Sequence, residues 1–185
     1  VAVDLQHRVR RHGVPGRVQV TRATADLLPM SGGEVALSFL PLCHIFERTG
    51  DYWFFFTGTS IAYVESFDLV PICMQEVRPT IAMSVPRLYE KMYARVLENA
   101  LTGGAAKKRI FFWARGVADH WANEKLAGRE PSGILALQYK IAQKLVFSKL
   151  KARTGGRLRY FVSGGAPLAN EINKFFYAAG LTILE

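Results

Sequence analysis

Short apolar runs alternate with longer stretches of helical periodicity along this chain of 185 residues. Strands buried on both faces have few polar residues, and an alternation of such strands with helices favours a parallel sheet. The sequence therefore predicts an α/β fold, with a mostly parallel sheet covered by helices. The predicted strands are Val35–Leu40, Ser60–Val64, Pro79–Val85, Leu158–Val162 and Leu181–Leu184.

The longest predicted helices lie between the third and fourth strands, in a block at residues 105–150. Trp113 and Trp121 share one predicted helix face with Ile110 and Val117, and we expect this face to pack in the core. A second stripe, Leu137, Ile141 and Leu145, follows in the next helix. Another apolar window, Tyr52–Phe56 and Ile61–Val64, is shorter than the about 20 residues of a membrane span. We interpret it as a buried helix end followed by a buried strand.

Residues 1–30 differ from the remainder because they have no clean hydrophobic period. We expect a divergent or poorly structured segment there, with a turn at Gly13–Gly16, followed by one domain over residues 31–185. Half of the residues are hydrophobic, which is a globular composition. The first residue is not methionine, and we expect the chain to be a piece of a longer protein.

The formal charge of +9 favours anionic partners such as phosphates, nucleotides, nucleic acid or an acidic membrane surface. The same cations are equally compatible with ordinary solvated faces. Cys43 and Cys73 lie in apolar contexts, which predicts two buried thiols in a reducing cytosol, with a disulfide left open. Their spacing predicts no metal set.

Ligands of open parallel sheets bind beyond the carboxyl ends of the strands. Three unusual segments follow predicted strands: residues 41–44, 85–87 and 163–167. The last reads Ser-Gly-Gly-Ala-Pro, which lacks the pattern of either common phosphate-binding glycine loop. With Pro167 in the first turn of a predicted helix over Pro167–Ala179, this loop would present bare backbone N–H groups to an anion. A tight strand-to-helix turn is the alternative interpretation.

His44 is the candidate polar side chain after the first strand, where an imidazole could act on a carboxylate or a phosphate. A structural histidine is the alternative. Arg48 could act on a ligand or pair with Glu47 or Asp51, and Arg87 is similarly ambiguous. Since no nucleophile–base pair stands out, the residues alone predict a nucleotide- or anion-binding α/β domain.

Three motifs, in order and at fitting distances, resemble the long-chain fatty-acid–CoA ligases of the adenylate-forming superfamily. They are Leu37-Ser-Phe-Leu-Pro-Leu-Cys-His-Ile-Phe-Glu-Arg48, Val77-Arg-Pro-Thr-Ile-Ala-Met-Ser-Val-Pro-Arg-Leu-Tyr-Glu-Lys91 and Leu158-Arg-Tyr-Phe-Val-Ser-Gly-Gly-Ala-Pro-Leu168. The resemblance implies part of the large N-terminal domain of an enzyme that uses ATP, Mg²⁺ and CoA. A fatty acid and ATP give an acyl-adenylate, and the CoA thiol then displaces AMP.

By the same resemblance, His44 is implied beside the substrate carboxylate and the α-phosphate. Val85 and Pro86 are implied near the acyl pocket. A nucleotide-binding loop against the adenine is implied for Ser163, Gly164, Gly165, Ala166 and Pro167. No residue of this chain is implied as a ligand of Mg²⁺.

Three parts of the family pattern are not seen in this sequence: the phosphate loop, the Tyr-Gly-x-Thr-Glu motif expected just beyond Glu185, and the C-terminal domain with its catalytic lysine. We therefore expect that the chain alone does not turn over substrate. A ligase for a different acid is one alternative. A non-catalytic basic module is the other, carried by Lys107–Arg109 and Lys140–Arg153, although no nucleic-acid motif is present and no nucleic acid is expected. The expected location is cytoplasmic, with peripheral membrane contact.

Overall fold

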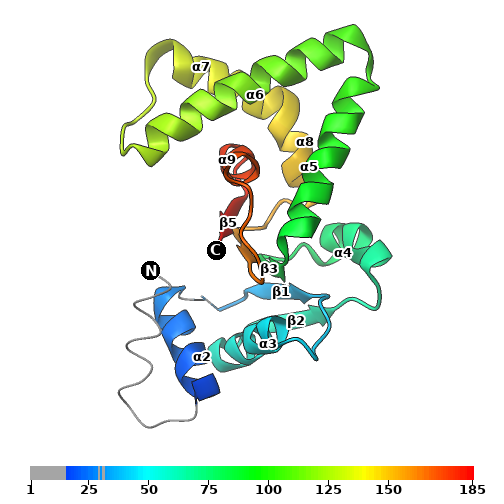
Figure 1. Cartoon of the computed structure of the whole chain (residues 1–185), viewed down its shortest axis with the longest axis vertical. Coiled ribbons are helices and arrows are strands. Elements are labelled where there is room, and N and C mark those ends of the chain that lie inside the picture. Colours follow the sequence, from blue (N-terminus) through cyan, green and yellow to red (C-terminus); the bar gives the residue numbers. More distant parts are fainter. Residues whose placement is uncertain (1–15, 29, 31) are drawn as a thin grey trace.

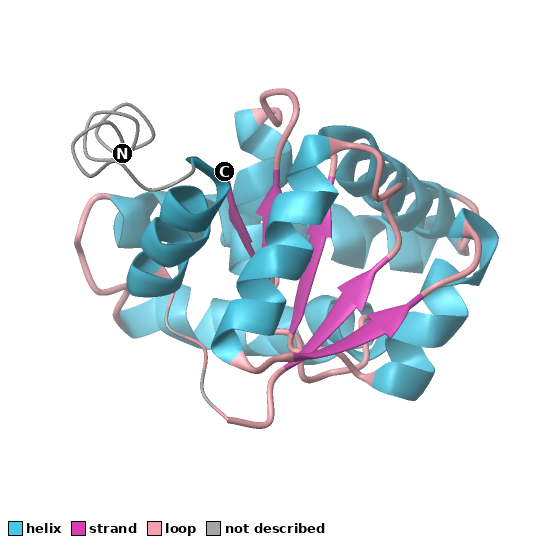
Figure 2. Cartoon of the chain, turned by 90° about the horizontal axis from the view of Figure 1, so that it is seen from below, coloured by secondary structure: helices cyan, strands magenta, loops and turns pink. Residues whose placement is uncertain are grey.

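The computed structural model describes residues 16–28, 30 and 32–185. Its five strands form one parallel sheet in the order β2-β1-β3-β4-β5, which confirms the predicted fold class. Figure 2 shows these strands side by side with helices around them. The strands are β1 (Val35–Ser38), β2 (Ser60–Tyr63), β3 (Ile81–Ser84), β4 (Tyr160–Ser163) and β5 (Thr182–Leu184).

Helices follow each strand up to β4, as expected for crossover connections between parallel strands. The longer helices, α5 and α6, extend away from the sheet, and α9 lies between α6 and β5 (Figure 1). The helices are α2 (Gly16–Leu27), α3 (Ile45–Thr57), η1 (Phe67–Leu69), α4 (Val70–Val77), α5 (Pro86–Leu101), α6 (Gly104–Leu126), α7 (Gly133–Ala142), η2 (Gln143–Phe147, a π-helix), α8 (Ser148–Arg153) and α9 (Asn170–Ala178).

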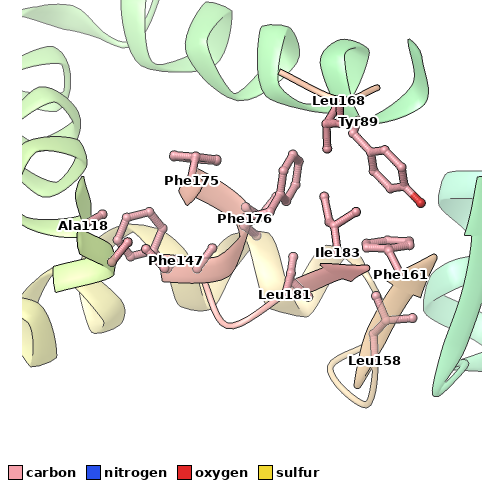
Figure 3. Close-up of a cluster of buried hydrophobic side chains, with 14 of the residues drawn as sticks. Tyr89, Ala118, Phe147, Leu158, Phe161, Leu168, Phe175, Phe176, Leu181 and Ile183 are labelled. Carbon is pink, nitrogen blue, oxygen red and sulfur yellow. The ribbon is translucent and has the colours of Figure 1, made fainter. Parts of the chain in front are cut away.

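The sheet has two differently covered faces. Leu37, Ala82 and Phe161 share one row across β1, β3 and β4, and they point into a large hydrophobic cluster with α4, α5 and α9. Tyr89, Phe175 and other aromatic rings meet in this cluster (Figure 3). We call this side of the sheet the apolar face. Its rings pack edge to face, the arrangement that their quadrupoles favour.

The opposite face carries α3, with α2 packed against α3. Its buried hydrophobic residues are few: Ala36, Trp53, Phe54, Ile81 and Met83. Glu47 and Asp51 of α3 are buried on the same side of the sheet. We call this side the ionisable face. The two acidic residues at helical spacing distinguish it from the apolar face.

Two predictions of burial were wrong. In the window Tyr52–Phe56, Trp53 and Phe54 are buried, but Phe55 is 69% exposed. The strand that follows, β2, is at the edge of the sheet and is only partly covered. An aromatic run cannot turn every ring inward when one helix side faces away from the sheet, so Tyr52, Phe55 and Phe56 are left outside.

The helical block shows the same effect. Trp121 stacks on Tyr139 with 4.1 Å between ring centroids, but Trp113 is exposed, so the predicted core stripe is only partly confirmed. Leu137, Ile141 and Leu145 are also exposed. The side that packs inward is instead lined by Ala142, Phe147 and Leu150.

Within residues 1–30, Gly16–Leu27 forms the helix α2, which the lack of a clean period did not predict. The expectations for residues 1–15 lie outside the described residues. Across the described part of the chain, no helix is both long enough and apolar enough to cross a membrane.

Candidate functional site

The three segments singled out after strands lie at one edge of the sheet, because β1, β3 and β4 are adjacent and parallel. The backbone N–H of Gly164 donates to the carbonyl oxygen of Ser84 over 3.1 Å. A methyl group added to Gly164 would come within 2.3 Å of the Phe46 ring, and one added to Gly165 would lie 4.0 Å from Cγ1 of Val85. The structure therefore brings the glycine loop against Val85 of the second segment and against Phe46, two residues beyond the first segment.

The glycine loop runs from the end of β4 to α9. Gly165 has φ +87°, a left-handed conformation that favours glycine. The helix begins only at Asn170, so the prediction that Pro167 lies in its first turn is wrong. The backbone N–H of Leu168 donates to Oε1 of Glu185 over 2.7 Å, and the Leu168 side chain is buried in the large cluster. These two contacts hold the segment extended, away from a helical path.

His44 occupies the N-cap position of α3 and its side chain is exposed. Its backbone N–H donates to the carbonyl oxygen of Pro41 over 3.0 Å, which closes a turn after β1. Nε of Arg48 donates to the carbonyl oxygen of Leu42 over 3.0 Å, and ties that turn to the helix. The imidazole thus stands at the sheet edge on a turn fixed at both ends.

The structure buries Val85 partly and Pro86 fully, and it leaves Arg87 exposed. Pro86 is the first residue of α5, a position where the missing N–H removes no helical bond. In that same edge region the hydroxyls of Ser84 and Ser163 are buried side by side in register, and neither has a hydrogen-bond partner among the described residues. These two hydroxyls are buried polar groups at the strand ends from which the loops depart.

Glu47 was missed as a functional candidate by the sequence analysis. It is 1% exposed, and its Oε1 accepts a hydrogen bond from Oγ of Ser38 over 2.6 Å. Burial raises the pKa of Glu47 from 4.5 to about 7, against the lowering effect of the Ser38 hydroxyl, and the charge of Asp51 raises this pKa further. The available signal was an acidic pair at i and i+4 inside an otherwise aromatic helix.

Cys43 is exposed and Cys73 is half-buried, and both are free thiols, so the prediction of two buried cysteines is wrong. Among the described residues, no group of three or more His, Cys, Asp or Glu side chains could hold a metal ion. A groove of about 370 Å³ lies elsewhere, between α6 and α9, with Arg115, Asp119, Glu171 and Lys174 in its wall. None of the predicted site residues lines this groove.

Comparison with known proteins shows the family of the chain. Residues 13–185 match the family described as "AMP-binding enzyme". The chain is 36% identical over 154 residues to the long-chain-fatty-acid–CoA ligase FadD15 of Mycobacterium tuberculosis, a match that covers 83% of the chain. It is 31% identical over 167 residues to the human long-chain-fatty-acid–CoA ligase ACSBG2, covering 88% of the chain. In both cases it spans 25% of the relative's length.

A solved structure has the same fold. It is the adenylation domain of a carboxylate reductase from Mycobacterium chelonae, with a TM-score of 0.52 and 21% identity. This match covers 90% of the chain and 22% of the solved chain. The sheet order, the motifs at its edge and these similarities agree, and the chain belongs to the AMP-binding enzyme family, with long-chain-fatty-acid–CoA ligases among its relatives.

Proposed function

We propose that this chain forms the edge of an active site that holds an acyl-adenylate, in a ligase that joins a fatty acid to CoA. The observation that carries the proposal is that three strand ends share one sheet edge, where the glycine loop meets the start of α3 at Phe46 and the end of β3 at Val85. The relatives named as long-chain-fatty-acid–CoA ligases support the choice of a fatty acid.

The reaction brings a carboxylate and a phosphate together. A carboxylate oxygen attacks the α-phosphorus of ATP and pyrophosphate leaves; the CoA thiol then attacks the acyl carbon and AMP leaves with the bonding electron pair. Gly165 lets a flat ligand approach the backbone, because no Cβ stands in the way, whereas the space of a Cβ at Gly164 is filled by the Phe46 ring. The exposed imidazole of His44 is available to donate to the carboxylate or phosphate oxygens. ATP enters such reactions as its magnesium complex, and we assign no step to the metal.

Binding of a stable acyl-adenylate mimic, hexadecanoyl-sulfamoyl-adenosine, tests this proposal. Calorimetry on the 185-residue chain should detect binding, and His44→Ala should weaken it about tenfold, the loss of one hydrogen bond to a charged group. His120→Ala is the matched control, since His120 is an exposed histidine on α6. Equal affinities of the His44→Ala and His120→Ala variants, or no binding by the unaltered chain, would overturn the proposal.

The choice of a fatty acid as the substrate rests on the relatives alone. Calorimetry with the octanoyl and benzoyl analogues of the same mimic tests that choice. A preference for a shorter or aromatic acyl group would replace the fatty acid by a different acid. We also propose that the chain by itself does not form the thioester, which an ATP- and CoA-dependent assay would contradict by detecting product. Steeply salt-dependent DNA binding without mimic binding would favour the basic module instead.

A further inference from the structure

Glu47, which the proposed reaction does not use, is buried next to the turn that carries His44. We propose that Glu47 is a positioning residue, which as a neutral acid fixes the turn between β1 and α3 and on ionisation loosens it. The turn comprises residues 39–44. Its effect on ligand binding rests on the proposed function, whereas the behaviour of the turn itself does not.

The contacts of Glu47 reach across the turn. Ser38, the last residue of β1, donates its hydroxyl proton to Oε1 of Glu47 over 2.6 Å, and both side chains are buried. The backbone N–H groups of Leu40 and Phe39 also act on the carboxyl group and lower its pKa. Glu47 therefore joins the start of α3 to the strand end from which the turn departs.

The surroundings of Glu47 make its ionisation unfavourable. Oε2 of Glu47 and Oδ1 of Asp51 have no hydrogen-bond partner among the described residues, and Oδ2 of Asp51 accepts from the Tyr63 hydroxyl over 2.9 Å. Asp51 adds a negative charge one helical turn away. Tyr89 of α5 also feels Glu47: burial raises the pKa of Tyr89, and the Glu47 charge raises it further.

The neighbouring helix α2 brings the charged residues Arg22 and Asp26, both exposed. Arg48, beside Glu47 in α3, donates from Nε to the carbonyl oxygen of Leu42. Among the described residues, no ion pair to a cation is recorded for Glu47 or Asp51. A buried carboxylate without a cation gains most by admitting water, and the turn is the part of its surroundings that has an exposed side.

The test follows the backbone amides of Leu40 and Cys43 by ¹⁵N NMR and hydrogen exchange in the full chain, from pH 5 to pH 9. In the unaltered chain both amides should shift with a midpoint near the pKa of Glu47, about 7. As pH rises toward that value their exchange, corrected for its intrinsic pH dependence, should become about tenfold faster and then level off above it, a change of about 1.4 kcal/mol in the opening equilibrium.

Variants separate Glu47 from the nearby imidazole. Glu47→Gln keeps an acceptor for Ser38 but cannot ionise, so the midpoint should vanish, while His44→Gln should retain it. Ser38→Ala should speed exchange of both amides at every pH. Ser84→Ala is the matched control, because Ser84 is likewise a buried serine at a strand end and its hydroxyl has no hydrogen-bond partner among the described residues.

A midpoint that survives Glu47→Gln, or equal exchange in Ser38→Ala and Ser84→Ala, would overturn the proposal. Binding of the acyl-adenylate mimic is measured on the same samples. If the mimic does not bind, the proposed function fails while the amide titration still decides the role of Glu47. If it binds, the unaltered chain should lose affinity from pH 6 to pH 8 and Glu47→Gln should not.

Discussion

The two faces of the sheet are built from different kinds of side chain. On the apolar face, α5 and α9 pack aromatic rings on the strands, and Tyr89 directs its hydroxyl to the carbonyl oxygen of Val162 over 3.0 Å. On the ionisable face, α3 buries Glu47 and Asp51 with single hydroxyl partners from Ser38 and Tyr63. The buried carboxyl groups of the second face are only partly satisfied. Among the described residues, the unpaired buried groups on the first face are instead the uncharged hydroxyls of Ser84 and Ser163, in line with Ala82 and Phe161 at the strand ends.

The two faces also differ in how close their characteristic residues lie to His44 along the chain. The partly satisfied carboxyl groups lie in α3, the helix that His44 caps, whereas most buried rings of the large cluster belong to α5, α6, η2 and α9. Unpaired buried carboxylates lower stability, and such residues are found where a site needs a particular electrostatic environment. The apolar face thus supplies stability that the ionisable face gives up next to the candidate site.

The largest expected effect is on the apolar face. Phe176 is fully buried, with ring centroids 6.2 Å from Tyr89 and 5.6 Å from Phe175. Phe176→Ala should lower the free energy of unfolding by about 3–5 kcal/mol, through lost burial and the cavity left behind. Urea denaturation measures this change.

Phe112→Ala is the control for that prediction, because Phe112 is an exposed phenylalanine in α6. It should change the free energy of unfolding by about 1 kcal/mol or less. Similar losses in the two variants would mean that the large cluster does not carry the stability of the fold.

The order of strands and helices was predictable because strands with few polar residues and periodic helices are local patterns. Pro86, for example, begins α5 directly after β3, as its fixed φ and missing N–H allow. Burial was less predictable. Leu137 and Leu145 lie on a periodic stripe, but α7 and η2 turn a different side inward, and periodicity does not say which side the tertiary packing covers.

The sequence predicted which loops lie at the sheet edge, but it did not predict the residues that hold those loops in place. That the edge loops lie together was predictable, because the carboxyl ends of adjacent parallel strands share one edge, and the chain brings Gly164 and Gly165 against Phe46 and Val85; their role as a ligand site stays a prediction. Glu47 was missed because its proposed role depends on its burial, and an acidic residue is expected to be exposed. The late start of α9 was missed because it depends on Glu185, a residue 17 positions away from Leu168.

The ionisable face should make the stability of the fold depend on pH. The folded chain keeps the Glu47 proton up to a pKa of about 7, whereas the unfolded chain loses it near 4.5, so stability falls as pH rises between these values and is flat above them. The full fall attributable to Glu47 is about 3 kcal/mol. Glu47→Gln should remove it, and so be the more stable protein at pH 8.

Thermal unfolding at pH 5 and pH 8 measures this difference. The gain of Glu47→Gln over the unaltered chain should be present at pH 8 and small at pH 5. An equal gain at both values would show that Glu47 acts through packing and not through its charge. Glu171→Gln is a suitable control, because Glu171 is an exposed acid in the first turn of α9.

The smallest effect is expected where the two faces meet, at Gly164. A methyl group there would lie 2.3 Å from the ring of Phe46, a residue of α3, so Gly164→Ala should cost about 1–3 kcal/mol by overpacking. Phe46→Ala in the same background should recover part of that loss, which a double-mutant cycle by urea denaturation would measure as coupling. Gly116→Ala in α6 meets no heavy atom within 4 Å and should gain about 0.5–1 kcal/mol. If Gly164→Ala and Phe46→Ala were simply additive, the glycine loop and α3 would not be in contact, and the two faces would not share an edge at His44.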